Sequence, residues 1–163
     1  MRLVLMALIP ILFLLGGCDR ERIARLEEGI STEADVRQQF GEPVTVTVQA
    51  DGSRLMEYPR QPEGWTNYFI GIGADGKMNS LRQVLTETNF AKVEPGMDRL
   101  QVRALLGRPA QQQVFALKNE EVWDWRFKPQ QASRMFSVTF DSDGRVLRSA
   151  LGDDPRETQG GGG

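Results

Sequence analysis

The sequence predicts an α+β protein built from two tandem units, each with two short helices packed on a three- or four-stranded antiparallel sheet. Three observations predict this fold: a helical segment that ends at a glycine occurs twice, residues with the two-residue period of strands follow each copy, and Asp-Gly pairs separate those strands. We expect the first unit at residues 29–88, the second at residues 89–151, and a disordered tail at residues 152–163, where acidic residues precede four glycines.

The repeated segment runs from Gly29 to Pro43 in the first unit and from Gly96 to Pro109 in the second. Matched residues lie 66 positions apart: Val36 and Val102, Arg37 and Arg103, Phe40 and Leu106, Gly41 and Gly107, and Pro43 and Pro109. The apolar pair in each copy is four residues apart and therefore lies on one helical face. A glycine with a proline two residues later predicts the end of each helix.

Capping residues predict where the two helices begin. Ser31 or Thr32 can cap the first helix, and Asp98 can cap the second, with Gln101 at the spacing of a capping box. A further short helix is expected before each repeated segment, over residues 21–28 and 89–93. Each unit therefore begins with two helices.

Strands are expected where apolar residues alternate with polar ones. Four such runs are Val44, Val46 and Val48; Tyr68, Ile70 and Ile72; Trp123, Trp125 and Phe127; and Phe136, Val138 and Phe140. This period is typical of half-buried antiparallel strands. Asp51-Gly52, Asp75-Gly76 and Asp143-Gly144 predict tight hairpin turns, because glycine adopts positive φ without steric cost.

The first residues have the pattern of an export signal. Arg2 precedes an apolar run over residues 3–15, which is shorter than the roughly 20 residues that span a bilayer as a helix. Leu15, Gly16, Gly17 and Cys18 follow, and this sequence resembles the lipobox of bacterial lipoproteins. The resemblance implies that residues 1–17 are removed and that Cys18 is acylated, so that residues 18–28 form a lipidated N-terminus with the first short helix. The alternative is an ordinary secretory signal that ends near a buried cysteine.

Composition excludes several functions. The chain has no histidine, one cysteine and a net charge of −2, with 20 basic and 22 acidic residues. The usual general base and the usual soft metal ligands are therefore missing, and no basic cluster indicates nucleic-acid binding. Asp124 and Asp141 are available acids, but their spacing does not indicate convergent chemistry. We expect no enzyme, no cofactor, no metal and no nucleic-acid partner.

A family resemblance follows from residues 96–151. The pattern Gly-Met-x4-Val-x3-Leu-Gly-x-Pro, followed by a Trp-rich strand and an Asp-Gly hairpin, resembles the SmpA/OmlA (BamE-like) lipoprotein family. The resemblance implies two helices on a small antiparallel sheet, an outer-membrane address, and envelope protein partners, among them the β-barrel assembly machinery. It thus implies an adaptor of envelope biogenesis that is tethered to the membrane by its lipid anchor.

Two departures from this family leave an alternative open. The family usually has one unit, whereas residues 29–86 match more loosely as a second one, and the tandem layout is similar to that of β-lactamase inhibitory proteins. A binder or inhibitor of an envelope enzyme is therefore the alternative function. In addition, Asp19 follows the expected acylation site and resembles the signal that retains lipoproteins in the inner membrane of enteric bacteria, so the inner membrane also stays open.

Candidate partner-binding residues are aromatic or basic: Trp65, Arg99, Arg108, Trp125 and Arg126. For Trp125 and its neighbours at two-residue spacing we expect the buried face of a sheet, with an open face as the alternative, and Arg126 then points the other way. Trp65 lies in a loop, as an exposed anchor or folded over a sheet edge. Arg99, Arg103 and Arg108 surround the second repeated helix, as a solvated face or as a contact for an acidic partner or lipid phosphate.

Overall fold

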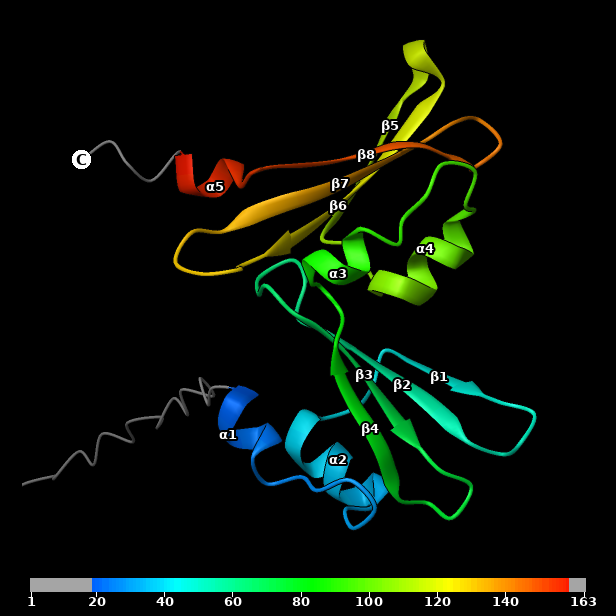
Figure 1. Ribbon diagram of the computed structural model, residues 1–163, viewed down its shortest axis with the longest axis vertical. Coiled ribbons are helices and arrows are strands. Elements are labelled where there is room, and N and C mark those ends of the chain that lie inside the picture. The colour runs from blue at the N-terminus through cyan, green and yellow to red at the C-terminus, as the bar shows by residue number, and fades with distance from the viewer. Residues whose placement is uncertain (1–18, 159–163) are drawn as a thin grey trace, which may run out of the picture.

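The computed structural model describes residues 19–158, which form two units arranged one above the other along the long axis of the molecule (Figure 1). Each unit contains one four-stranded antiparallel sheet whose strands follow their order in the sequence. The expected α+β class and tandem layout are therefore confirmed, with four strands in each sheet.

The first unit begins with two helices and continues as a meander of four strands. Its elements are α1 (Asp19–Ile23), α2 (Glu33–Phe40), β1 (Thr45–Val48), β2 (Arg54–Pro59), β3 (Asn67–Ile72) and β4 (Met78–Gln83). The helix expected at residues 21–28 is thus shorter and begins earlier. Gly52 and Gly76 have φ values of 82° and 80° in the β1–β2 and β3–β4 turns, as the Asp-Gly pairs predicted.

The second unit repeats this order. Its elements are α3 (Glu87–Phe90), α4 (Arg99–Leu106), β5 (Gln111–Phe115), the 3-10 helix η1 (Ala116–Lys118), β6 (Glu120–Phe127), β7 (Arg134–Phe140), β8 (Val146–Asp153) and α5 (Pro155–Thr158). Gly144 has a φ of 77° in the β7–β8 turn. The helix expected at residues 89–93 corresponds to α3, which begins two residues earlier.

The repeat seen in the sequence extends to the details of the backbone. Thr32 and Asp98 each form a capping box with the residue three positions later. Gly41 and Gly107 end α2 and α4 with φ values of 81° and 70°. Both sheets have a register irregularity near the end of their third strand. The two units are therefore copies of one design.

Each unit has its own hydrophobic core between its helices and its sheet. The first core contains Val36, Phe40, Met56, Tyr58, Tyr68, Ile70, Ile72 and Met78. The second contains Leu85, Phe90, Val93, Val102, Leu106, Trp123, Trp125, Phe127, Phe136, Val138, Phe140 and Val146. We call the face of each sheet that packs on its own helices the inner face and the opposite one the outer face. The aromatic stripe of β6 lies on the inner face.

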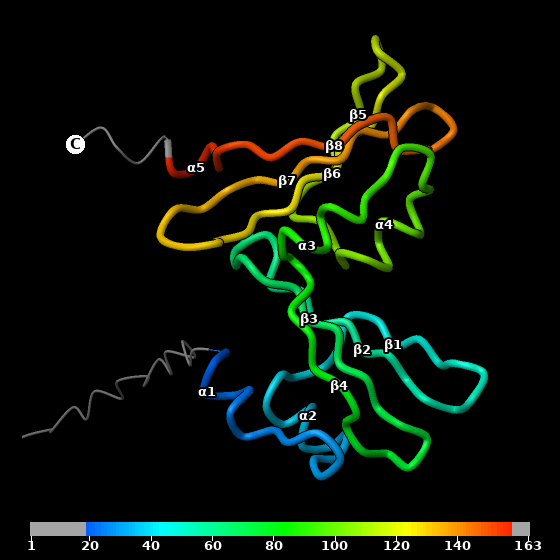
Figure 2. Tube along the Cα trace, in the orientation of Figure 1, coloured from blue at the N-terminus to red at the C-terminus, as the bar shows by residue number. Residues whose placement is uncertain are grey.

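Helix layers and sheets alternate along the molecule (Figures 1 and 2). In order they are α1 with α2, the first sheet, α3 with α4, and the second sheet. The outer face of the first sheet therefore meets α4 of the second unit. No helix or strand of residues 19–158 packs across the outer face of the second sheet, which is covered only at Arg126, by the β2–β3 loop and the residues before α5. This difference between the two sheets determines where surface is free.

Two expectations from the sequence are wrong. Val46 and Val48 were expected to be half-buried, but they are 39% and 68% exposed, because β1 is an edge strand with a partner on one side only. Residues 152–158 were expected to be disordered, but β8 and α5 include them, and Asp154 is completely buried. The rest of the expected tail, residues 159–163, lies outside the described residues.

Candidate functional site

Two polar side chains of the first sheet cap a helix of the second unit. Glu57 and Asn67 lie on the outer face and are 5% and 1% exposed. The backbone N–H of Arg108 donates to Glu57 Oε1 over 2.6 Å, and Arg103 Nη2 donates to Oε2 over 3.1 Å. Asn67 Nδ2 donates to the carbonyl oxygens of Leu106 and Arg108 over 2.7 and 2.9 Å. Since the last carbonyls of a helix lack donors of their own, these contacts fix α4 on the first sheet.

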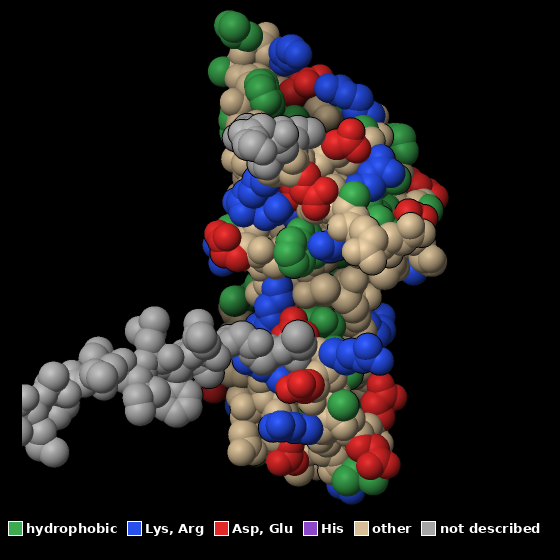
Figure 3. Space-filling model, turned by 90° about the vertical axis from the view of Figure 1, so that its left-hand side faces the viewer, with side chains coloured by type: hydrophobic (Ala, Val, Ile, Leu, Met, Phe, Trp, Pro, Cys, Tyr) green, Lys and Arg blue, Asp and Glu red, His purple; other side chains and the backbone are tan. Residues whose placement is uncertain are grey.

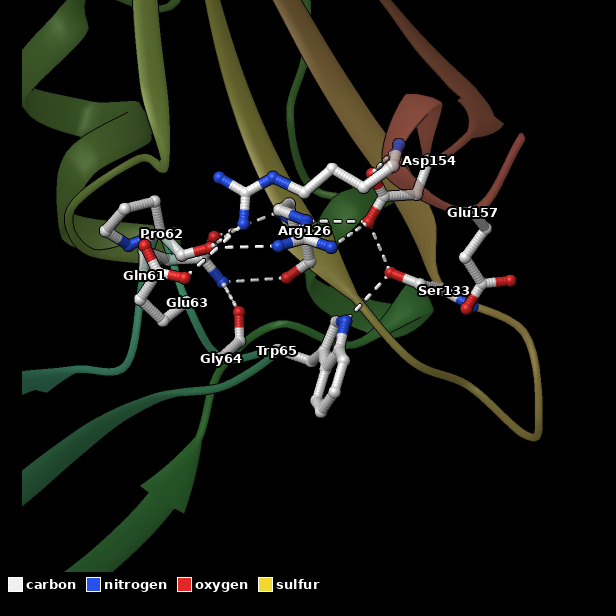
Figure 4. A network of polar contacts seen from close by, with 10 residues as sticks. Gln61, Pro62, Glu63, Gly64, Trp65, Arg126, Ser133, Asp154 and Glu157 are labelled. Carbon is white, nitrogen blue, oxygen red and sulfur yellow. Dashed lines mark hydrogen bonds and ion pairs between the residues drawn. The ribbon is translucent and has the colours of Figure 1, made fainter. Parts of the chain in front are cut away.

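The loop between β2 and β3 makes a second contact with the other unit (Figure 4). Trp65 Nε1 donates to Ser133 Oγ over 2.8 Å. Gln61 Nε2 donates to the carbonyl of Arg126 over 2.8 Å, and Gln61 Oε1 accepts the backbone N–H of Arg126 over 3.2 Å. Arg126 Nη1 donates to the carbonyl of Pro62 over 3.0 Å. Backbone and side chains thus join the two units at this loop.

A buried ion pair supports this contact from within the second unit. Both Nε and Nη2 of Arg126 lie 2.6 Å from Asp154 Oδ2, and the two side chains are 7% and 0% exposed. Burial alone would raise the pKa of Asp154, but hydrogen bonds from Ser133, the backbone of Arg156 and Arg126 outweigh it and lower the pKa. A buried charge that is paired in this way is costly to separate. Arg126 is therefore structural and is not available to a partner.

The structure resolves the two interpretations of each tryptophan. Trp125 is completely buried, and its Nε1 donates to the carbonyl of Gly107 over 3.0 Å, so it is a core residue and not a partner contact. Trp65 is 38% exposed, and Lys128 Nζ lies 4.9 Å from its ring centroid. Trp65 is thus neither a free anchor nor a cover for its own sheet, because its polar atom joins the two units.

The arginines around α4 have different surroundings. Arg99 Nη2 lies 2.6 Å from Glu121 Oε2, and its guanidinium lies 5.7 Å from the ring centroid of Phe140. The side chain of Arg108 is exposed, while its backbone binds the first sheet. Of these two candidates, only Arg108 offers a free guanidinium to an acidic group.

The expected acylation site, Cys18, and the expected signal at residues 1–17 lie outside the described residues. Asp19, the expected sorting residue, is the first residue of α1, and its Oδ1 lies 3.1 Å from Arg60 Nη2. The guanidinium of Arg60 also lies 5.3 Å from the ring centroid of Phe40. The carboxylate of Asp19 is therefore paired within the folded unit.

A groove of about 490 Å³ lies between the outer face of the first sheet and α4. Its lining consists of Thr45, Thr47, Leu55, Glu57, Phe69, Arg99, Leu100, Arg103, Ala104 and Trp123. Leu100 is 80% exposed, although it lies on a helix that faces the core with its other side. The groove exists because only the C-terminal end of α4 is bound by Glu57 and Asn67. Five apolar residues, two threonines, two arginines and one carboxylate thus form an open concave surface at the junction.

A second exposed apolar feature is the tip of the β5–β6 hairpin. Val114, Phe115 and Leu117 are 76%, 43% and 103% exposed. Figure 3 shows hydrophobic side chains at this upper end of the molecule, while acidic and basic side chains are interspersed over the rest of the visible face. The residues of the hairpin tip do not line the groove.

Two further kinds of feature are absent from residues 19–158. In this range no group of three His, Cys, Asp or Glu side chains is placed to hold a metal ion. None of the helices between residues 19 and 158 has the length and apolar character needed to cross a bilayer.

The sequence did not indicate Glu57, Asn67, Leu100 or Asp154 as important residues. One signal was present for Glu57, which alternates with the core residues Met56 and Tyr58 and therefore had to point to the outer face. The outer face of the first sheet is covered because the two units stack, and no local sequence pattern shows this stacking.

Comparison with known families identifies the second unit. Residues 83–150 match the family model described as the outer membrane protein assembly factor BamE domain. The matched range begins at the end of β4 and includes α3, α4 and the strands of the second sheet as far as most of β8. The second unit thus matches the BamE domain family, and the resemblance expected from residues 96–151 is confirmed. No curated protein sequence matches the chain.

Several solved structures are similar to the chain. A candidate osmotically inducible lipoprotein, OsmE, is 22% identical over 47% of this chain and 90% of its own, with a TM-score of 0.38. A candidate β-lactamase inhibitor protein from Streptococcus mutans is 15% identical over 83% of this chain and 95% of its own, with a TM-score of 0.36. The DUF4309 protein YjgB from Bacillus subtilis is 16% identical over 79% of this chain and 82% of its own, with a TM-score of 0.31.

Proposed function

We propose that the chain is a lipid-anchored periplasmic adaptor in envelope biogenesis, an accessory factor of outer-membrane β-barrel assembly that acts by binding proteins and not by catalysis. The match of residues 83–150 to the BamE domain supports a role in outer-membrane protein assembly. The lipobox-like sequence before Cys18 supports the lipid anchor. The proposal of protein binding rests on one observation, the apolar groove between the first sheet and α4.

The groove has the features of a protein-binding surface. Leu55, Phe69 and Leu100 supply apolar area, and the burial of such area is the dominant favourable term in most protein association. Arg99 and Arg103 lie in the same lining and already have acidic partners, so they do not attract free anions strongly. An exposed leucine at the edge of a concave apolar surface is typical of a site that is covered by a partner. The groove thus suits apolar side chains presented by another protein.

In-cell photo-crosslinking tests this function. A photoreactive amino acid is placed at Leu100 in the full-length chain, with Leu117 as the matched control, since both leucines are highly exposed but only Leu100 lines the groove. We expect crosslinks to components of the β-barrel assembly machinery from position 100 and not from position 117. Equal crosslinks from both positions, or crosslinks from position 100 to one envelope enzyme alone, would contradict the proposal; the latter would support an inhibitor.

The proposed anchor and address are tested by labelling and fractionation. A palmitate analogue is expected on the wild type and not on Cys18→Ser. Asp19→Ser is expected to change the distribution between inner and outer membrane, if Asp19 acts as a sorting residue. Because this change also breaks the ion pair with Arg60, Arg60→Gln is the matched control, which removes the pair and keeps Asp19. Equal redistribution in both variants would assign the effect to the ion pair and contradict sorting by Asp19.

A further inference from the structure

Glu57 and Asp124 occupy the same position in the two units. Glu57 pairs with Thr45 across β1 and β2, and Asp124 pairs with Gln111 across β5 and β6. In each unit, the backbone carbonyl of the acidic residue accepts the N–H of the residue just before the first strand. Both carboxylates therefore lie on the outer face of their sheets, at the same place.

The two carboxylates differ in what covers them. Glu57 is bound by the end of α4, through Arg103 and the backbone N–H of Arg108. Asp124 is 8% exposed, and within residues 19–158 its side chain accepts one hydrogen bond, from Ser137 Oγ over 2.6 Å, and has no basic partner. Burial raises the pKa of Asp124, whereas an arginine beside it would have the opposite effect.

We propose that the outer face of the second sheet binds the C-terminal turn of a short helix from a partner protein, with an arginine of that turn on Asp124. The arginine lies one turn before the glycine that ends the helix, and the first free backbone N–H after that glycine also points to Asp124. Arg103, Gly107 and Arg108 of α4 show this arrangement on the first sheet. The site goes beyond the groove, because it lies on a different sheet and requires a different partner chemistry.

The occupant must be basic, which argues against a second copy of this chain. The only equivalent helix end on the free surface of the described chain is that of α2, which has Arg37 and Gly41 at the matching positions. Arg37, however, is already bound by Glu33 and Glu42. Glu42 replaces Arg108, so a second copy would place a carboxylate beside Asp124. In α4, by contrast, the residues at these two positions are Arg103 and Arg108.

Part of the arrangement on the first sheet is not repeated. Asn67 caps the last carbonyls of α4, and the residue at its place in the second sheet is Met135, as the pairing with Pro59 and with Arg126 shows. Met135 is half-buried and cannot donate a hydrogen bond. The partner helix therefore packs apolar atoms on Met135, and recognition depends on the charge of Asp124.

Peptides taken from the chain itself test the site. A helix-stabilised peptide of residues 96–109, which contains α4 and its end, is added to the isotope-labelled full-length protein, with a matched peptide of residues 29–43 as the control. We expect chemical-shift changes at the outer face of the second sheet, around Gln113 and Ser137, for the first peptide and not for the second. Changes only at the outer face of the first sheet, or equal effects of both peptides, would overturn the proposal.

Two variants make the peptide experiment specific. Asp124→Asn keeps the hydrogen bond with Ser137 and removes the charge, and we expect at least about tenfold weaker binding of the first peptide. Gln111→Lys changes an exposed residue directly opposite Asp124, and the new ammonium is expected to occupy the carboxylate and weaken binding similarly. Because Gln111 is exposed, this variant is expected to fold even if the other does not. Unchanged affinity in both variants would overturn the assignment to Asp124.

Crosslinking in cells identifies the natural occupant. A photoreactive amino acid at Gln113, on the outer face of β5, is followed by mapping of the crosslinked segment. A segment with an arginine one turn before a glycine at a helix end supports the proposal. A second copy of this chain, lipid, any other segment, or no crosslink would overturn it. Since the groove is probed from Leu100, failure at Gln113 with crosslinks at Leu100 would leave the proposed adaptor function intact.

Discussion

At the scale of single residues, the two units satisfy their buried polar groups differently. In the second unit the indole N–H of Trp125 and the guanidinium of Arg126 have partners at 2.6 to 3.0 Å. In the first unit the buried hydroxyl of Tyr58 has no hydrogen-bond partner among residues 19–158, and burial raises its pKa to about 12. A buried hydroxyl with no partner costs stability, because it has lost its hydrogen bonds to water.

We therefore expect Tyr58→Phe to raise the free energy of unfolding by about 1 kcal/mol at neutral pH. The pKa of Tyr58 is higher in the folded than in the unfolded state, so wild-type stability from this group is lost as the pH rises from about 10 through about 12. Tyr58→Phe is expected to lose less stability over this pH range, because it has no hydroxyl to ionise at position 58. Urea unfolding at neutral and alkaline pH measures both effects.

Tyr68→Phe is the matched control for this substitution. Tyr68 is also buried in the first core, and its pKa is raised by burial, but its side chain is hydrogen-bonded to Thr66. Removal of that hydroxyl is expected to lower the free energy of unfolding at neutral pH. Destabilisation of similar size in both variants would show that the Tyr58 hydroxyl does have a partner.

At the scale of elements, the sequence predicted those features that depend on neighbouring residues. The capping boxes of α2 and α4, the Asp-Gly turns and the buried aromatic stripe of β6 all follow from spacing along the chain. The exposure of β1 and the order of residues 152–158 did not follow, because they depend on which strand lies at an edge and on the partner of Asp154. The alternating pattern of Val44, Val46 and Val48 is the same in an edge strand and a central one.

The candidate site was less predictable than the fold for the same reason. Glu57 and Arg103 are 46 positions apart, and Trp65 and Ser133 are 68 apart, so no local pattern connects them. Of the residues selected from the sequence, Trp125 and Arg126 proved structural, while Arg99 lines the groove. Aromatic and basic residue types are common to cores and interfaces, and only burial separates the two roles.

The glycines that end α2 and α4 allow a prediction at this scale. Gly41→Ala and Gly107→Ala both place a Cβ at positive φ, which costs about 1–2 kcal/mol. A Cβ at position 41 meets no atom within 4 Å, whereas one at position 107 comes within 3.1 Å of both Asn67 Nδ2 and Glu57 Oε1. We therefore expect Gly107→Ala to lower the free energy of unfolding by more than Gly41→Ala does. Equal losses in chemical denaturation would contradict a close contact between α4 and the first sheet.

At the scale of the whole molecule, the junction makes the two cores depend on each other. Each core is separate, but buried hydrogen bonds of Glu57, Asn67, Gln61 and Arg126 join the units, and breaking them leaves buried polar groups without partners. Two small domains connected only by a linker would unfold independently. The junction argues for one cooperative unit here.

We expect a single unfolding transition for the wild type, with the same midpoint by tryptophan fluorescence and by amide exchange in the first sheet. The double variant Glu57→Ala/Asn67→Ala is expected to separate the two midpoints, because it removes both side chains that hold the end of α4. Glu63→Gln is the control, since it removes only an exposed ion pair between the units, with Arg156 at 3.6 Å, and exposed pairs contribute little. Two transitions in the wild type would show that the junction does not couple the units. Coincident midpoints in the double variant would show the same.

The alternation of helix layers and sheets gives the molecule a direction. One end is a helical layer and the other is a sheet, and the boundary between the units seats the helices of the second unit on the sheet of the first. Such a design lengthens by whole units, as in solenoid repeats, because each further boundary repeats the same contact of helices on a sheet. With the anchor proposed at Cys18, the second unit acts as a spacer that holds the last sheet further from the membrane than a single unit would.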